Sequence, residues 1–342
     1  MHARIDHAAG GGVIATDMTR REIGVLLLLA VLCAVVASAS PQFLSVANLQ
    51  NVARLVGTFG ILSIGVGIVI ITGGIDLSVG SICALLGVLL SMMLVEWHWP
   101  APMALAAVVA LGGCLGAAHG VLIARLRLQP FIVTLCGLLL YRGAARYIAG
   151  DSTKGFGTGA GFEWARALAS GSVAGVPMPF VVMCVVAILA WVLLHRSVYG
   201  RHLFAIGHNE EAARYSGVGT RAVIAWAYVL SGVLAAVSAI IIAFYTNSIS
   251  PASHGNFYEL YAIAAAVVGG CSLRGGEGSV LDIIMGAALL QVLRNLVNLL
   301  DIPGSLDFAV MGAVILIGAI ADQLFARSRG IRNRESGIRA QR

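Results

Sequence analysis

Long apolar stretches separated by short polar segments run through most of this sequence. Ten of them approach the roughly 20 residues that an α-helix needs to cross a bilayer. They lie at about 23–39, 55–72, 79–95, 103–125, 131–148, 179–195, 222–246, 259–272, 279–300 and 308–326. The stretch 259–272 is the shortest. The pattern predicts an all-α, polytopic membrane protein with about ten transmembrane helices.

The segment 72–80 is a polar interruption between two of these stretches. Its glycines are Gly73, Gly74 and Gly80. It also carries Asp76, and an ionisable group inside a bilayer costs roughly 2.5–3.5 kcal/mol, so it normally faces protein or water. The residues predict a helix that breaks beside a cavity on a transport path. The alternative is a tight cytoplasmic turn in which Asp76, assisted by Ser78, caps a helix that begins near Val79.

Arginines are concentrated in alternate connections between the apolar stretches. They are Arg4, Arg20 and Arg21, then Arg125 and Arg127, then Arg196, Arg201, Arg214 and Arg221, and finally six arginines between 327 and 342. Because short cytoplasmic loops are rich in Lys and Arg, this pattern predicts that both termini are cytoplasmic. The net charge of +6 then reflects topology and does not indicate a nucleic-acid partner. The basic tail is expected to touch anionic membrane lipid.

The composition favours one membrane domain. Hydrophobic residues make up 59% of the chain and charged residues only 11%, against roughly 25% charged in soluble domains. The longest connection, 149–177, is rich in Gly, Ser and Thr and too short for a soluble domain. We therefore expect a cytoplasmic N-terminal segment at 1–22, a transmembrane domain at 23–326 and a basic cytoplasmic tail at 327–342.

Glycine patterns suggest close helix packing and an internal repeat. Gly112, Gly116 and Gly120 recur at four-residue spacing, which lets helix backbones approach closely. The segment 73–77 also resembles 269–273, and paired interruptions in two halves of a transporter point to its substrate site. Two Gly-Gly matches among 42 glycines can equally arise by chance.

The polar segment 209–218 has the features of a short capped helix. Asn209 suits the N-cap, Glu210 and Glu211 suit the positive end of the helix dipole, and Gly217 suits the stop. A short helix on the cytoplasmic face can serve as a docking element. An ordinary capped connector is the alternative interpretation.

Four blocks together resemble the permease subunits of the ribose/xylose/arabinose/galactoside group of ATP-binding-cassette (ABC) importers. The blocks are Gly73–Ser81, Pro130–Leu135 with Arg142-Gly143, Glu210–Val218, and Glu259–Ala264 running into Gly269-Gly270. The resemblance covers nearly the whole chain. It implies that the 209–218 helix couples to an ATPase subunit and that the block around Asp76 lies near the translocation path.

The candidate site residues follow from this resemblance together with the local patterns. For coupling to the ATPase they are Asn209, Glu210, Glu211, Ala212, Ala213 and Gly217. For the translocation path they are Gly73, Gly74, Asp76, Ser78, Gly80, Thr134, Gly269 and Gly270.

Two residues depart from the family pattern. His119 stands where Asn is usual, and Asp282 replaces a small residue. For His119 we favour a hydrogen-bonded packing histidine over a substrate contact. For Asp282 we expect the first turn of a helix near the cytoplasmic face.

The chain lacks a P-loop, and its single lysine, Lys154, follows Thr153 and not a glycine-rich motif. It is therefore not expected to be an enzyme or to bind a cofactor or metal, and a partner would use the ATP. The resemblance implies an ABC ATPase subunit, a periplasmic sugar-binding protein and a second permease copy as partners. The expected location is a bacterial inner membrane, and the expected substrate is a monosaccharide, with a ribose-like pentose first.

Two other classes remain open from the sequence. One is a stand-alone secondary transporter that uses Asp76 to couple its substrate to protons. The other is a channel or scaffold subunit. The 209–218 segment discriminates them, because a proton-coupled carrier needs no docking helix.

Overall fold

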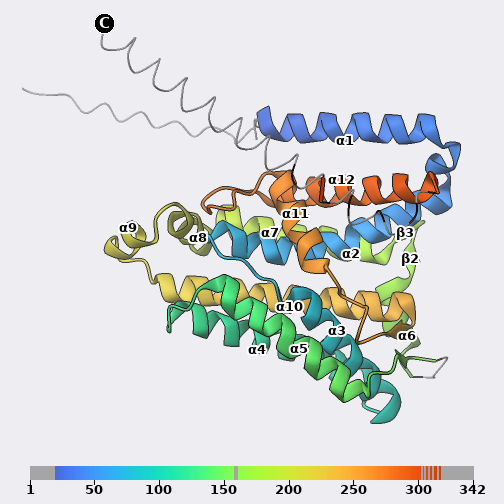
Figure 1. Cartoon of the computed structure of the whole chain (residues 1–342), viewed down its shortest axis with the longest axis horizontal. Helices are drawn as coiled ribbons and strands as arrows, with labels where there is room; N and C mark the ends of the chain where they lie inside the picture. The colour runs from blue at the N-terminus through green and yellow to red at the C-terminus, as the bar shows by residue number, and fades with distance from the viewer. Residues whose placement is uncertain are drawn as a thin grey trace, which may run out of the picture.

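The computed structural model describes residues 20–157 and 161–301, with isolated positions beyond, and the chain is almost entirely helical (Figure 1). The long helices are α1 (Arg20–Ala39), α2 (Val46–Ile71), α3 (Val79–Ser91), α4 (Ala101–Ala124), α5 (Pro130–Ala149), α7 (Met178–Arg196), α10 (Thr220–Thr246), α11 (Tyr258–Gly269) and α12 (Val280–Leu299). The short ones are η1 (Pro41–Leu44), the π-helical η2 (Met92–Glu96), α6 (Glu163–Ser170), α8 (Val198–His208) and α9 (Glu210–Tyr215). The prediction of an all-α membrane protein is confirmed.

Within the described residues, seven helices are long and apolar enough to cross a membrane, with η2 extending α3. The segments Gly24–Ala39 and Tyr258–Gly269 are shorter apolar helices. The expected span 308–326 lies outside the described residues apart from isolated positions, as do the 327–342 tail and most of the 1–22 segment. The second span begins at Val46 and not near residue 55, because the Ser45 hydroxyl caps it by accepting the Asn48 N–H at 3.3 Å.

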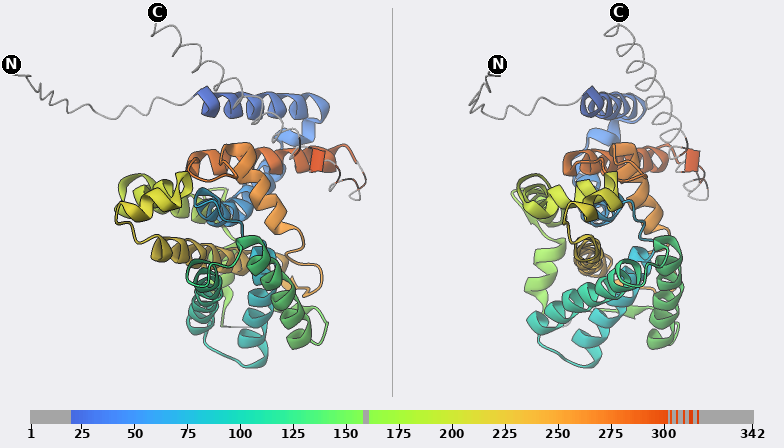
Figure 2. Two further views of the ribbon diagram at one scale, coloured as in Figure 1. Left: turned by 60° about the vertical axis from the view of Figure 1, so that its left-hand side comes forward. Right: turned by 90° about the vertical axis from the view of Figure 1, so that its left-hand side faces the viewer.

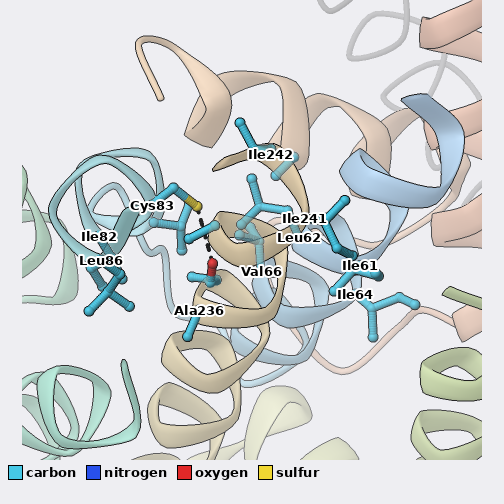
Figure 3. Packing of buried hydrophobic residues seen from close by; sticks show 14 of the residues in the cluster. Ile61, Leu62, Ile64, Val66, Ile82, Cys83, Leu86, Ala236, Ile241 and Ile242 are labelled. Atoms are coloured by element: carbon cyan, nitrogen blue, oxygen red, sulfur yellow. Dashed lines mark hydrogen bonds between the residues drawn. The ribbon is translucent and has the colours of Figure 1, made fainter. Parts of the chain in front are cut away.

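Helix α2 occupies the centre of the bundle. In the apolar 18-residue stretch of α2, 89% of the residues are buried, compared with 22% in the corresponding stretch of α7. Helix α2 is therefore enclosed by protein, and α7 lies at the periphery. Isoleucines and leucines of α2 and α3 pack against α10 (Figure 3). Figures 1 and 2 show that α1 lies beside α12 at one edge of the bundle, and that α4 and α5 lie at the opposite edge.

Small residues let α4 and α10 pack with their backbones in contact. A Cβ at Gly112 would lie 2.5 Å from the Gly232 carbonyl oxygen. A Cβ at Gly116 would lie 2.2 Å from the Tyr228 carbonyl oxygen, and one at Gly120 would lie 2.7 Å from the Ala225 Cα. The predicted role of this glycine stripe in close packing is confirmed.

The 149–177 connection contains α6 and two short antiparallel strand pairs. They are β1 (Lys154–Gly155) with β4 (Ser248–Ile249), and β2 (Ser172–Val173) with β3 (Val176–Pro177). Lys154 also pairs with Glu96 at 2.6 Å. At the start of this connection, the Asp151 carboxylate accepts two hydrogen bonds from Arg146 in the last turn of α5, and these bonds lower the pKa of that carboxyl. The connection therefore ties the ends of α3 and α10 together.

Replacing Gly116 by Ala is expected to lower the free energy of unfolding by ~1–3 kcal/mol, because the new methyl group meets backbone that cannot move aside. Gly143→Ala is the matched control, since a Cβ there meets nothing within 4 Å. The control should be neutral or stabilising by up to ~1 kcal/mol. Unfolding of the purified variants in detergent, followed by tryptophan fluorescence, measures both; equal effects would contradict this account of the α4–α10 contact.

Candidate functional site at the break between α2 and α3

The chain between α2 and α3 returns from the end of α2 into the bundle as irregular backbone. Gly73 has φ +80°, and a Cβ at Gly74 would lie 2.6 Å from the Tyr228 hydroxyl. The Ile75 carbonyl accepts hydrogen bonds from the hydroxyls of Tyr228 (3.3 Å) and Thr134 (3.4 Å). Side chains of α10 and α5 thus satisfy backbone that would otherwise be costly inside a membrane.

Asp76 is only 1% exposed, and the protein satisfies both of its carboxylate oxygens. Oδ1 accepts from the Ser78 N–H at 3.0 Å and from the Ser78 hydroxyl at 2.6 Å. Oδ2 accepts from the Ser231 hydroxyl at 2.9 Å. These three hydrogen bonds satisfy the carboxylate within the protein, so that its burial leaves neither oxygen without a partner.

The position of Asp76 combines features of both sequence interpretations. Ser231 lies about 16 Å along α10 from Thr220, so Asp76 lies inside the bundle and not in a surface turn. Its bond to the Ser78 N–H nevertheless stabilises the start of α3, as a cap does. Asp76 lines neither of the two cavities described below.

A row of hydrogen bonds extends from Asp76 to α4 and α5. The Ser78 hydroxyl lies 3.4 Å from His119 Nδ1, and the Tyr141 hydroxyl lies 2.9 Å from His119 Nε2. Because the Ser78 proton goes to Asp76, we assign the His119 proton to Nδ1, so that Nε2 accepts from Tyr141. The buried His119 is thus a hydrogen-bonded packing residue, as favoured from the sequence.

A second polar group surrounds Gly80, in the first turn of α3. A Cβ at Gly80 would lie 2.1 Å from the Gly255 carbonyl oxygen and 2.5 Å from Glu259 Oε2. Arg142 donates to the carbonyls of Pro251 (2.9 Å) and His254 (2.5 Å). Three of the four sequence blocks therefore meet around the start of α3.

The loop that follows the second glycine segment, and not Gly269-Gly270 itself, meets the first segment at one end of the bundle. The Gly276 N–H donates to the Ile71 carbonyl at 2.9 Å, and a Cβ at Gly275 would lie 2.7 Å from the Gly73 nitrogen. Gly269 and Gly270 themselves end α11 and pack toward α12, where a Cβ at Gly269 would lie 2.0 Å from the Asp282 carbonyl oxygen. They do not join Asp76 in its hydrogen-bonded group.

Asp282 occupies the first turn of α12, where the Ser279 hydroxyl accepts its N–H at 3.1 Å. The expected place of this residue in the first turn of a helix is confirmed.

The predicted helix at 209–218 is present as α9. The Asn209 side chain accepts the Ala212 N–H at 2.9 Å, and Gly217 has φ +86° just after the helix. Glu210 accepts from the Thr220 hydroxyl at 3.2 Å, while Glu211 is exposed and Ala213 is buried. The cap and the stop are therefore as the sequence predicted.

Helix α8 anchors α9 to the rest of the bundle. The Tyr199 hydroxyl donates to the Val223 carbonyl at 3.1 Å, and burial raises the pKa of Tyr199 above its usual value, so the donor stays protonated. At the other end of α8, a Cβ at Gly207 would lie 2.0 Å from the Ile71 carbonyl oxygen and 2.2 Å from the Gly276 nitrogen. The segment before α9 thus packs directly on the end of α2.

A cavity of about 350 Å³, here called the junction cavity, separates α9 from the break. Its lining residues are Thr72, Gly73, Gly74, Ile123, Ala124, Arg127, Leu128, Gln129, Pro130, Glu210, Glu211, Arg214, Ile224 and Tyr228. Predicted path residues and predicted coupling residues share this cavity. Tyr228 connects it to the Asp76 group through the bond to the Ile75 carbonyl.

Comparison with known proteins identifies the family. The model of the family described as "Branched-chain amino acid transport system / permease component" matches residues 48–319. The chain belongs to this permease family. The match confirms the resemblance found from the four sequence blocks.

Curated relatives of this permease share most of their length with it. The ribose import permease protein of Escherichia coli (strain K12) is 39% identical over 301 residues, covering 87% of this chain and 92% of the relative. The ribose import permease protein of Bacillus subtilis (strain 168) is 37% identical, covering 90% and 94%. The D-allose transport system permease protein of E. coli (strain K12) is 31% identical, covering 89% and 92%. No solved structure matches the chain at a significant level.

Sequence reasoning missed Ser231, Tyr141 and Tyr228 in this site. Each is a single hydroxyl inside an apolar stretch, and nothing in its neighbourhood along the chain shows which residue it will meet. A signal did exist for Arg142 and Glu259, which belong to the recognised blocks and are charged residues within apolar stretches.

Replacing Ser231 by Ala is expected to lower the free energy of unfolding of the permease by ~1.5–3 kcal/mol, because it removes a hydrogen bond to a buried carboxylate. Ser238→Ala is the control on the same helix: this hydroxyl is equally buried but donates to the neutral Thr58 carbonyl, a bond worth ~0.5–1.5 kcal/mol. Tryptophan fluorescence in a denaturant series compares them. A larger loss in Ser238→Ala would refute the anchoring role of Asp76.

Proposed function

We propose that this permease forms the translocation path of an ABC importer for a monosaccharide, with a ribose-like pentose as the first candidate. The observation that carries the proposal is the junction cavity, in which α9 faces the glycine break that leads to Asp76. The names of the relatives, which are ribose import and D-allose transport permeases, support a sugar as the substrate. Other pentoses and hexoses follow ribose as candidates.

The packing around α8 and α9 supports a mechanical coupling route. An ATPase subunit that binds α9 pushes on this helix. Helix α8, which precedes α9, is packed through Gly207 against the backbone of Ile71 and Gly276. Ile71 is the last residue of α2, directly before the break, and Gly276 lies in the loop before α12. Movement of α9 is therefore transmitted to both interrupted regions at once, and alternating access follows from their displacement.

The proposed importer also contains other subunits. ATP is bound and hydrolysed by a partner ATPase subunit, and a periplasmic sugar-binding protein delivers the substrate. A second copy of the permease completes the path. We place the protein in a bacterial inner membrane with both termini cytoplasmic, which puts Arg125, Arg127, Arg201, Arg214 and Arg221 on the cytoplasmic side.

The satisfied hydrogen bonds of Asp76 favour this function over a proton-coupled carrier. A carboxylate that releases and binds protons during each cycle needs access to water, whereas Asp76 is enclosed and accepts three hydrogen bonds. Uptake of labelled ribose into cells tests the choice. Uptake should stop on ATP depletion and persist for a time after a protonophore when ATP is held constant; the reverse pattern would favour the carrier.

Glu211→Lys is expected to reduce sugar uptake at least tenfold and to abolish co-purification of the ATPase subunit, because it reverses the charge of an exposed residue on α9. Glu163→Lys is the matched control, since Glu163 is also an exposed first-turn glutamate of a short helix, α6, on the other face. Uptake and co-purification are measured at equal permease abundance. Normal uptake in Glu211→Lys would rule out the coupling role of α9.

Gly207→Val is expected to uncouple transport while leaving ATPase binding at α9 intact. The added side chain would meet the backbone of Ile71 and Gly276 and displace α8 from the end of α2. Gly219→Val is the control, because a Cβ at Gly219 meets nothing within 4 Å. The measurement is the ratio of sugar transported to ATP hydrolysed in proteoliposomes, and an unchanged ratio would exclude this route.

A further inference from the structure

A second cavity, independent of the proposed transport path, lies between α4 and α10. It measures about 650 Å³ and is here called the α4–α10 groove. Its lining residues are Ala117, Val121, Arg125, Arg221, Ala222, Ala225, Trp226 and Val229. The lining residues recur at four-residue spacing, so they lie on one face of each helix: Ala117, Val121 and Arg125 on α4, and Arg221, Ala225 and Val229 on α10. The groove therefore follows both helices for about 12 Å.

Helix packing explains why the groove exists. The glycine stripe of α4 brings the two backbones together, and the side chains that flank the contact, Ala117, Ala222 and Ala225, are too small to fill the space beside it. Val121 and Trp226 are 44% and 57% exposed at its rim. In a membrane protein, an apolar groove of this kind is open to lipid chains.

One end of the groove is strongly basic. Arg125 is the C-cap residue of α4 and Arg221 is the second residue of α10, so both guanidinium groups lie at the same end. Neither has a hydrogen-bond or ion-pair partner within residues 24–157 and 161–301, and no acidic residue lines the groove. The N-cap of α10, Gly219, offers no side-chain acceptor, so the positive end of this helix adds to the field.

We propose that the α4–α10 groove binds an anionic phospholipid of the cytoplasmic leaflet. The phosphate of the headgroup lies between Arg125 and Arg221 at the N-terminus of α10, and one acyl chain lies along Ala117, Val121 and Ala225. Trp226 lies about 8 Å along α10 from Arg221, at the depth where indole rings anchor to the membrane interface. Basic pockets between transmembrane helices on the cytoplasmic side are suited to this lipid class.

A second permease copy fits the groove less well. In a membrane, two copies related by a two-fold axis along the bilayer normal place the same patch at the same depth. Four arginines would then converge with no acidic residue from the groove to neutralise them. A lipid supplies the missing negative charge and the apolar chain together.

Native mass spectrometry of the whole permease tests the proposal, with phosphatidylglycerol and phosphatidylcholine of equal chain length as probes. The wild-type protein should retain phosphatidylglycerol in preference to phosphatidylcholine. Arg125→Gln with Arg221→Gln should weaken phosphatidylglycerol retention roughly tenfold or more. The control pair Arg196→Gln with Arg201→Gln removes the same charge from exposed residues on the same side and should change retention less than about twofold.

A charge-neutral variant tests the apolar part of the site. Ala222→Trp fills the groove at an exposed position and should reduce retention of phosphatidylglycerol while Arg125 and Arg221 remain. Equal retention in the wild type, the double Arg variant and Ala222→Trp would overturn the proposal. So would a change of oligomeric state in these variants without a change in bound lipid, which would identify the groove as an interface between copies.

Discussion

The buried carboxylate of Asp76 is the constraint on which the rest of this bundle depends. A charge in this position is tolerated only when hydrogen-bond donors are brought to it, and the donors come from Ser78 and from Ser231 on α10. Ser78 in turn contacts His119 of α4, which bonds to Tyr141 of α5. One carboxylate thereby specifies how α3, α4, α5 and α10 must approach one another.

Close backbone contacts make that arrangement possible. Glycines of α4 let this helix approach α10 closely. Glycine is also needed in the break itself, because a Cβ at Gly74 would lie too close to the Tyr228 hydroxyl of α10. The same small residues leave the α4–α10 groove on the outer surface. The close contact between α4 and α10 that positions the interior hydroxyls thus leaves a groove on the outer surface, lined by small apolar side chains and two arginines.

The site also has a mechanical organisation. The break after α2, the loop before α12 and the end of α8 meet through Ile71, Gly207, Gly275 and Gly276, and the junction cavity lies beside them. Irregular backbone in this region is held by specific bonds and is not loosely packed. These contacts join the three segments, as the proposed coupling route requires.

The sequence by itself determined the class of fold and the local structure. Runs of apolar residues predicted where most of the described helices lie, although not the start of α2 at Val46. Asn209 and Gly217 determined the start and end of α9, because caps and stops depend on residues three or four positions apart. Only the tertiary structure decided which side chains meet. Ser231 is 155 positions from Asp76, and Arg125 is far along the chain from Arg221. A hydroxyl or guanidinium within or beside an apolar helix carries no local sign of its partner, so the pairing is set by how the helices pack.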